Sequence, residues 1–270
     1  MHRESAIGVL AATLLCCAAP EPGSRSRAPR QELPDPVRVD ESDPGANFLA
    51  PNFRDRDGTP VFVHWTREMM PIRVFIERPF DAPAGGTPED AWRAVKAGIA
   101  LWEAALRAEL SWFDVEFVEE PAETGVRVTW MRAMARTKRG RTRCRALPVA
   151  APAIRCDMSL AIGRNASPMG GALSGGGLFG GGLADVGELI ERQTLAQLRN
   201  LGAHEFGHAL GLVHCWCDSI MNYSSSRRPR AYIREIDRRT LLELMALPNG
   251  LRSDGEISEA LSGKPSATAR

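Results

Sequence analysis

Histidine and net charge are both scarce in this chain of 270 residues. Five histidines occur, and the formal net charge at pH 7 is +1. A net charge so close to zero gives no general reason to expect nucleic acid or an anionic membrane as a partner. Apolar residues make up 44% and charged residues 25%, as in ordinary globular proteins. The chain is therefore long enough for one domain with a sizeable core, or for two small lobes.

A long apolar run is also missing. The run Ala6–Leu15 follows a basic N-terminus and is too short to anchor the chain across a bilayer. Together with the small residues that follow it, this run predicts a secretory signal over residues 1–19. A lipoprotein signal, with Cys16 or Cys17 as the lipidated residue, is the alternative. We therefore expect a secreted or cell-envelope protein that meets a membrane only through such an anchor.

Two further segments show little apolar periodicity. Residues 20–60 are rich in proline, glycine, arginine and aspartate, which is typical of a disordered linker or leader. Residues 249–270 are polar and rich in small side chains, which is typical of a disordered tail. We therefore expect the folded domain at residues 61–248.

One stretch, with the sequence HEFGHALGLVH, carries a metal-binding pattern. On a helix, His204 and His208 lie four residues apart and point to the same face, which is the spacing that a single metal ion requires. Gly211 can adopt a positive φ, which ends the helix and lets His214 supply a third nitrogen. Three protein ligands leave the fourth position open for water, as in a catalytic zinc site rather than a structural one.

The acidic residue of this stretch is Glu205, directly after the first histidine. Its carboxylate is placed to take a proton from a metal-bound water, which indicates hydrolytic chemistry. The alternative interpretation is a helix with surface histidines and a glycine C-cap. Three of the five histidines of the chain lie in this stretch, which favours the metal site.

Ahead of the motif, the sequence predicts strands around one long helix. Ile72–Glu77 alternates and contains β-branched residues, as strands do. Thr87 and Pro88 then form a helix start, with threonine as the N-cap. The apolar residues of this helix recur at helical spacing and are expected in the core: Trp92, Val95, Ile99, Trp102 and Leu106. Further strands are expected at Asp114–Glu119, Val126–Met131 and Met158–Ile162.

Two segments of biased composition interrupt this pattern. The basic run Arg136–Arg145 could hold a phosphate backbone, but it lacks interleaved aromatic residues, so we expect a solvated loop. Gly163–Gly187 is dense in glycine and has no Gly-Lys-Ser/Thr, so a phosphate-binding loop has no support. We expect a flexible loop there, or a mobile flap over the substrate. A short strand at Leu183–Ile190, the metal-binding helix Thr194–Leu210 and a final helix Ile233–Leu247 complete the predicted order.

A turn with the sequence Ser219-Ile220-Met221-Asn222-Tyr223 follows the metal motif. Together, the motif and this turn resemble the metzincin zinc peptidases, which have an elongated zinc motif and a methionine-containing turn. The resemblance implies an α+β fold of the two-lobed zincin type, with a twisted mixed sheet, long helices and the zinc helix at the cleft. The upper lobe would extend to about residue 211, and residues 212–248 would form a small C-terminal lobe. Met221 would form an apolar floor below the histidines without binding the metal.

Different features of the sequence resemble different groups of metzincins. The short gap from His214 to Met221 is similar to matrixins. The Met-x-Tyr that ends at Tyr223 is similar to astacins and serralysins, in which such a tyrosine reaches the zinc or the oxyanion; packing at the lobe junction is the alternative role. Many matrixins bind a second, structural zinc, but only His64 remains upstream for it, so we expect that site to be absent. His64 is then a surface or packed residue.

Four cysteines follow the N-terminal signal, and an even count in an exported protein predicts disulfides. Cys144 with Cys156 closes a short loop and is our first expectation, which leaves Cys215 with Cys217. Pairing between the two loops is the alternative, and a role for Cys215 and Cys217 as further zinc ligands is another. No cysteine lies between Cys17 and Cys144, which argues against a pro-segment cysteine that caps the zinc.

These features predict a zinc-dependent endopeptidase, a hydrolase that acts on protein or peptide substrates as a monomer. One Zn²⁺ would be bound by His204, His208 and His214. Glu205 would be the general base that activates the water, and Tyr223 would help to stabilise the oxyanion. The substrate would lie extended along an edge of the sheet. The alternatives are a non-catalytic exported binding protein with a structural zinc, and an enzyme that processes itself or a cell-wall peptide.

Overall fold

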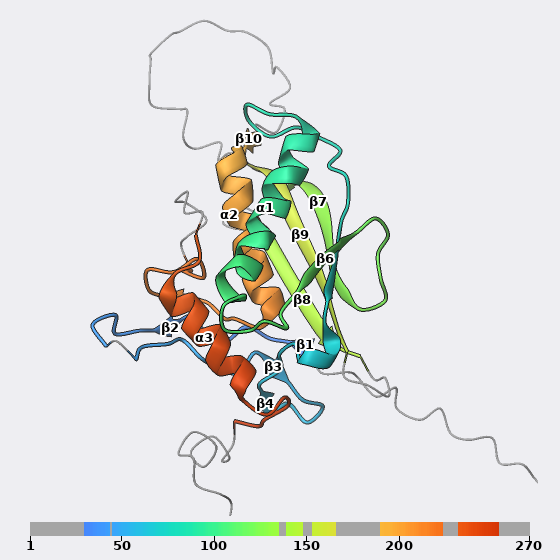
Figure 1. Ribbon diagram of the computed structural model, residues 1–270. Coiled ribbons are helices and arrows are strands. Elements are labelled where there is room, and N and C mark those ends of the chain that lie inside the picture. The colour runs from blue at the N-terminus through green and yellow to red at the C-terminus, as the bar shows by residue number, and fades with distance from the viewer. Residues whose placement is uncertain are drawn as a thin grey trace, which may run out of the picture.

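The computed structural model describes residues 30–43, 45–134, 139–147, 153–165, 190–223 and 232–253. These residues form an α+β structure, a mixed sheet with three α-helices and one short 3-10 helix (Figure 1). The helices are η1 (Arg67–Met69), α1 (Pro88–Leu106), α2 (Leu195–Leu210) and α3 (Glu235–Ala246). The strands are β1 (Arg30–Gln31), β2 (Val37–Arg38), β3 (Phe53–Arg54), β4 (Pro60–Val61), β5 (Ile72–Ile76), β6 (Val115–Val118), β7 (Gly125–Met134), β8 (Gly140–Ala146), β9 (Ile154–Asn165), β10 (Ile190–Arg192) and β11 (Cys215–Trp216).

Nine of these strands form one sheet in the order β4-β3-β1-β8-β9-β7-β5-β6, with β10 paired to β9. Strands β5, β6, β7 and β9 run parallel to one another, whereas β8 is antiparallel to β9. Beyond β8, the sheet continues with the antiparallel strands β1, β3 and β4. The two remaining strands, β2 and β11, pair in parallel beside the end of the metal motif.

Helix α1 begins where the sequence predicts. The Thr87 side chain accepts a hydrogen bond from the Asp90 amide, and the Asp90 carboxylate accepts one from the Thr87 amide. This reciprocal cap satisfies two amides that the helix itself leaves unbonded, and Pro88 fits the first turn because it has no amide hydrogen to lose. The expected core positions Val95, Ile99, Trp102 and Leu106 are fully buried, whereas Trp92 is partly buried.

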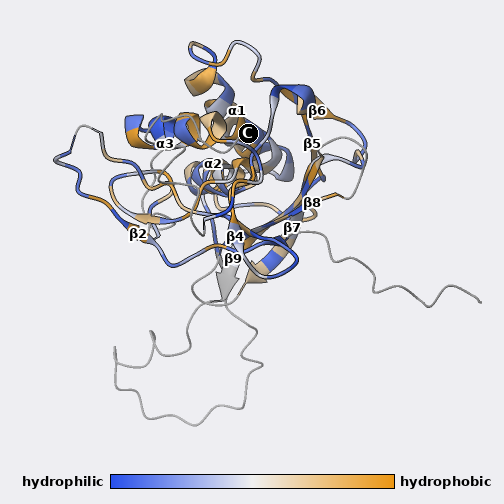
Figure 2. Cartoon of the chain, turned by 90° about the horizontal axis from the view of Figure 1, so that it is seen from below, coloured by the Kyte–Doolittle hydropathy of each residue, from blue (hydrophilic) through white to orange (hydrophobic). Residues whose placement is uncertain are grey.

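Helices α1 and α2 cover one face of the sheet side by side (Figures 1 and 2). They approach closely because glycines lie at their crossing. A Cβ atom on Gly98 of α1 would lie 2.1 Å from the backbone oxygen of Arg199 on α2. No side chain fits into that distance, so the crossing needs glycine. The apolar residues that fill the space between helices and sheet include Trp102, Met158, Leu198 and Phe206, none of them exposed.

The basic run forms a strand, so the expectation of a solvated loop is wrong from Gly140 onward. Thr142 and Cys144 of β8 are buried towards α2, and the arginines between them are exposed on the opposite face of the sheet. The alternation of arginine with small residues therefore indicates a strand with one buried and one solvent-exposed face. Residues 136–138 of the run lie outside the described residues.

The expectation of a linker at residues 20–60 is also wrong for residues 30–60. These residues supply β1 to β3 and the start of β4, and they bury Phe48 and Phe53, which are 0% and 3% exposed. Short strands of two residues leave no periodic pattern in the sequence, which is why composition alone suggested disorder. At the other end, residues 249–253 pack on the fold. Leu251 is buried, and the backbone of Arg252 forms an isolated antiparallel β-bridge with Val61.

Several predictions fall outside the described residues. They are the signal at residues 1–19, the rest of the expected linker to residue 29, most of the glycine-dense segment (166–187) and the tail from residue 254. Of the strand expected at Leu183–Ile190, only Ile190 is described, and it begins β10. Across the described segments, no helix combines the length and the apolar character needed to cross a membrane.

Candidate metal centre

Helix α2 presents the metal motif, and its two ends are defined by the sequence. Thr194 caps the first turn by accepting from the Gln197 amide, and the Gln197 side chain accepts from the Thr194 amide. At the other end, Gly211 adopts φ 107°, the left-handed conformation that favours glycine. The chain turns there as expected and returns towards the helix with His214. The helix and its turn therefore bring the predicted residues to one place.

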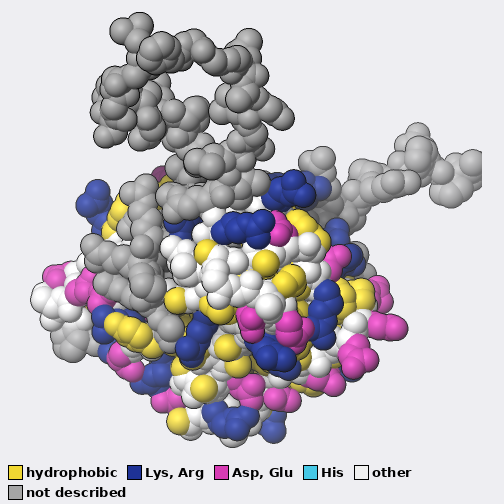
Figure 3. Space-filling model, turned by 90° about the horizontal axis from the view of Figure 1, so that it is seen from above, with side chains coloured by type: hydrophobic (Ala, Val, Ile, Leu, Met, Phe, Trp, Pro, Cys, Tyr) yellow, Lys and Arg dark blue, Asp and Glu magenta, His cyan; other side chains and the backbone are white. Residues whose placement is uncertain are grey.

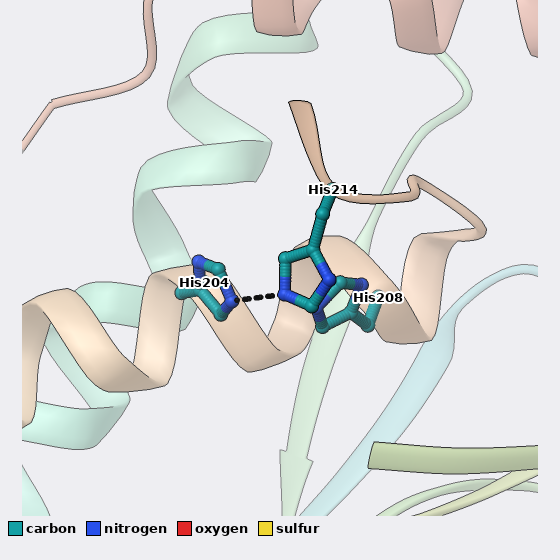
Figure 4. A group of neighbouring side chains, drawn as sticks. All are labelled: His204, His208 and His214. Atoms are coloured by element: carbon teal, nitrogen blue, oxygen red, sulfur yellow. Dashed lines mark hydrogen bonds between the residues drawn. The ribbon is translucent and has the colours of Figure 1, made fainter. Parts of the chain in front are cut away.

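The three predicted histidines converge. One potential ligand atom from each of His204, His208 and His214 lies within 4.8 Å of the others. The Nε2 atom of His214 lies 3.3 Å from that of His204 and 3.1 Å from that of His208. Figure 4 shows the first two rings on α2 and the third reaching back from the following loop. Among the described residues, this is the one group of three or more histidines, cysteines or acidic residues with that geometry.

The opposite ring nitrogens orient two of these histidines. Nδ1 of His204 donates to the backbone oxygen of Ile220 (2.7 Å), and Nδ1 of His208 donates to that of Leu212 (2.8 Å). Because Nδ1 carries the proton, the Nε2 lone pair of each ring points into the cluster, as metal-binding histidines require. Neutral imidazole suits zinc, copper, iron and nickel. The donor set therefore fits a transition-metal ion and does not by itself select one element.

Burial keeps the histidines neutral. It lowers the pKa of His204, and it lowers the pKa of His214 to about 3 with a further contribution from His204. The pKa of His208 falls well below its usual value because of burial and then because of the two neighbouring imidazoles. A neutral ring is the form that binds a metal, so the site does not have to lose protons at neutral pH before an ion can enter.

The last turn of α2 is tied down by residues from the N-terminal part of the chain. The Gln31 side chain donates to the backbone oxygen of His208 (2.7 Å), and the Trp65 indole donates to that of Ala209 (2.8 Å). The buried Asn52 side chain donates to Gly211 (2.9 Å). These donors satisfy carbonyls that a helix end leaves without partners. Val37 also donates to the backbone oxygen of His214 (2.9 Å), next to the β2–β11 pair.

Glu205 points towards the sheet and not into solvent. Its side chain is buried, and one carboxylate oxygen accepts a hydrogen bond from the Thr142 hydroxyl on β8 (2.7 Å). Gly140 lies so close that a Cβ atom there would be 2.4 Å from the other carboxylate oxygen. Burial raises the pKa of Glu205 to about 7, and the Thr142 hydroxyl opposes this rise. A carboxyl group with a pKa near neutrality can both take up and release a proton at physiological pH.

Met221 packs against α2 at Gly207. It is fully buried, and a Cβ atom on Gly207 would lie 2.4 Å from its sulfur. The absence of a side chain at Gly207, between the two helical ligands, therefore makes room for Met221.

An aspartate on α3 anchors the turn that contains Met221. Asp237 is fully buried and accepts hydrogen bonds from the Ser219 hydroxyl and from the amides of Ile220 (3.2 Å) and Arg234 (2.9 Å). The Ser219 hydroxyl oxygen in turn accepts from the Met221 amide (2.7 Å). Because the Ile220 carbonyl orients His204, Asp237 influences the position of His204 through this turn.

The cysteines lie in the two pairs expected first. The sulfur atoms of Cys144 and Cys156 are 2.00 Å apart, and those of Cys215 and Cys217 are 1.91 Å apart, which is disulfide distance. Pairing between the loops is therefore wrong, and so is a role for Cys215 and Cys217 as metal ligands, because their sulfurs bind each other. The pairs are compatible with an extracellular protein.

Two exposed aromatic side chains stand beside His214. Trp216 lies between the paired cysteines and is 46% exposed, and Tyr223 is 55% exposed. The Tyr223 ring lies edge-on to His214, with 5.3 Å between ring centroids, and 5.2 Å from the Trp216 ring. Tyr223 thus lies next to the third histidine, whereas Trp216 was not predicted as part of the site.

Sequence reasoning missed four supporting residues, namely Gln31, Asn52, Thr142 and Asp237. Asp237 had a weak signal, an acidic residue in the first turn of a predicted helix, but nothing in the pattern shows that it is buried. His64 is packed and not a ligand: it is 4% exposed, and its ring nitrogens contact the backbone oxygens of Trp65 and Leu247. No protein-family model and no curated protein matches this chain.

Proposed function

We propose that this protein is a zinc-dependent endopeptidase of the metzincin type. One observation carries the proposal: three imidazoles converge on one point, two of them oriented by hydrogen bonds at Nδ1, and the residue after the first histidine is a buried glutamate. A structural site has no need of a general base beside its first ligand. Met221 under the helix and the Asp237-anchored turn support the metzincin comparison. The disulfide pairs support export from the cell.

We propose a role for each residue from its position in the site. His204, His208 and His214 would hold the zinc, and a bound zinc supplies Lewis acidity, which lowers the pKa of a water molecule and polarises a carbonyl group. Glu205 takes the proton of the attacking water on a carboxylate oxygen and passes it to the leaving amine. Burial raises the pKa of this carboxyl group, which favours its holding the proton between the two transfers. Thr142 positions the carboxylate through its hydrogen bond.

In this proposal, Tyr223 acts on the reacting carbonyl. Its exposed ring lies at His214, so its hydroxyl can donate a hydrogen bond to the oxyanion as negative charge develops there. Trp216 extends the same surface with a second exposed ring. We propose that these two rings contact substrate side chains next to the scissile bond.

The substrate would add to β8 as a further strand. On one side β8 is bonded to β9 along its length, and on the other it meets β1 only at Arg145. Within the described segments, residues 140–143 therefore keep backbone donors and acceptors at an edge beside Glu205, where an extended peptide can bind. In this proposal, the sheet and α1 and α2 form the upper lobe, and the chain after Gly211, with β11 and α3, forms the lower one.

The proposal is tested by metal analysis and by casein cleavage. The purified protein should bind one zinc ion per chain, and its cleavage of casein should stop with a chelator and return with zinc. X-ray absorption should show three imidazole nitrogens and one further light ligand at about 2.0–2.1 Å from the zinc. A zinc with four protein ligands and no cleavage of casein or of a peptide library would instead support a binding protein with a structural metal.

A further inference from the structure

The outward face of the sheet, opposite α1 and α2, carries a row of arginines in opposed positions. The row crosses β3, β1, β8 and β9 and consists of Arg54, Arg30, Arg145 and Arg155, each paired in register with the next. Directly opposed residues of antiparallel strands project from the same face, and like charges there reduce stability. The fold thus places four positive charges together at a cost to itself.

Two further arginines of β8 widen this row into a patch. Arg141 and Arg143 alternate with the buried residues of the strand, so they project from the same face as Arg145. We call the six residues Arg30, Arg54, Arg141, Arg143, Arg145 and Arg155 the arginine face. The strands contribute two carboxylates to it: Glu32, directly after β1, and Asp157 on β9.

These two carboxylates neutralise only part of the charge. Glu32 binds Arg54 at 2.6 Å, and Asp157 lies 3.8 Å from Arg145 and 3.6 Å from Arg155. Within the described part of the chain, no carboxylate lies at ion-pair distance from Arg30, Arg141 or Arg143. The side chains are open to solvent, 48% for Arg54, 51% for Arg145 and 32% for Arg155. The face therefore has a formal excess of four positive charges that nothing in the fold requires.

The rest of the molecule does not share this excess. The whole chain has a formal net charge of +1, so the remainder is negative. The face seen from above in Figure 3 carries arginine and lysine side chains intermixed with acidic ones. A nearly neutral composition thus conceals a one-sided charge distribution, which is the kind of distribution that attracts an oppositely charged partner.

We propose that the arginine face docks on an anionic phospholipid bilayer. Neighbouring strands lie about 4.8 Å apart and alternate residues of a strand about 6.7 Å, so the charges fill an area in two dimensions. A linear polyanion would meet one row of such an array, whereas a bilayer presents phosphates across all of it. Arginine binds phosphate oxygens through two parallel hydrogen bonds. The large exposed apolar residues of the described chain lie outside β1, β3, β8 and β9, so these strands offer no stacking platform for single-stranded nucleic acid.

This docking leaves the metal centre free. Thr142 and Cys144, which alternate with the arginines of β8, project towards α2 and Glu205. The arginine face and the metal centre therefore lie on opposite sides of the same strand. A protein held by this face would present its histidine cluster away from the lipid, and the inference does not depend on the proposed peptidase activity.

The test is binding of the full chain to vesicles of phosphatidylcholine alone and of phosphatidylcholine with about 30 mol% phosphatidylglycerol. The neutral vesicles account for any insertion of the N-terminal apolar run. We expect stronger binding to the anionic vesicles, lost in about 0.5 M salt. The triple variant Arg30→Gln, Arg145→Gln, Arg155→Gln should weaken that binding about 100-fold, because each basic side chain near an anionic surface contributes about 1 kcal/mol.

The matched control is Arg78→Gln, Arg93→Gln, Arg107→Gln, which changes the net charge equally on the side of α1. It should change the binding less than about threefold. The arginine-face variant should also unfold at an unchanged or higher temperature, because repulsion within the row is relieved. Equal binding to both vesicles, or equal losses in the two variants, overturns the proposal. Binding to heparin or single-stranded DNA where anionic vesicles fail to bind would replace the bilayer with a soluble polyanion.

Discussion

The three histidines of the candidate metal centre and the groups that position them come from different parts of the chain. The histidines, the proposed general base Glu205 and the turn with Met221 all lie within residues 204–223, in a contiguous pattern. Their supports are dispersed: Gln31 and Asn52 fix the end of α2, Thr142 on β8 positions Glu205, and Asp237 on α3 anchors the turn. The chemistry of the site is therefore encoded locally, whereas its geometry depends on residues far away in sequence. Substitutions of the distant residues should change stability and zinc affinity, whereas substitution of Glu205 should change the rate of cleavage.

The largest effect among the supports is expected for Asp237→Ala. The substitution removes the acceptor for three donors, two of them buried, so we expect a loss of about 2–4 kcal/mol in the free energy of unfolding. The turn that orients His204 should also loosen, which should lower zinc affinity about 10- to 100-fold. Chemical denaturation and competition with a metal chelator measure the two effects.

The matched control is Glu235→Ala, which removes an exposed acidic residue from the same turn of α3. It should change the free energy of unfolding by no more than about 0.5 kcal/mol. If Asp237→Ala bound zinc as tightly as the wild type, the turn would not control the position of His204. The claim that distant residues determine the geometry of the site would then be contradicted where we expect its largest effect.

A smaller effect is expected for Gln31→Ala. The Gln31 side chain donates to the backbone oxygen of His208 and accepts from the Cys144 amide (2.9 Å), so it joins α2 to β8. Its removal should lower the free energy of unfolding by about 1–2 kcal/mol, since two half-buried bonds are lost. Glu32→Ala is the control next to it and should change the free energy by less than about 1 kcal/mol, because Glu32 has only an exposed ion pair. No difference between the two variants would mean that residues 30–31 are not part of the folded unit.

The sequence predicted the elements whose signals are local. The Thr87 cap, the alternation of Ile72–Glu77 and the His204–His214 spacing each depend on residues a few positions apart, and each is found in the structure. The position of His214 was predictable for the same reason, because Gly211 determines where the helix ends. Cysteine pairing followed from the short loop between Cys144 and Cys156.

What the sequence could not show depends on contacts between distant residues. Gln31 and Asn52 lie in a segment whose proline and glycine content suggested a linker, and their role appears only when the end of α2 lies beside them. The burial of Asp237 depends on the turn packed against α3. The arginine face depends on strand register, because Arg30 and Arg145 are far apart in sequence and become neighbours only through pairing.

The central claim is that Glu205 acts as a general base at a zinc held by three histidines, and Glu205→Ala tests it most directly. The measurement is the rate of casein cleavage by wild type and variant, each with its zinc content determined on the same sample. We predict that the variant keeps its zinc and loses cleavage by a factor of about 100 to 10,000, the usual contribution of a general base. A variant that retains both zinc and full cleavage would contradict the account.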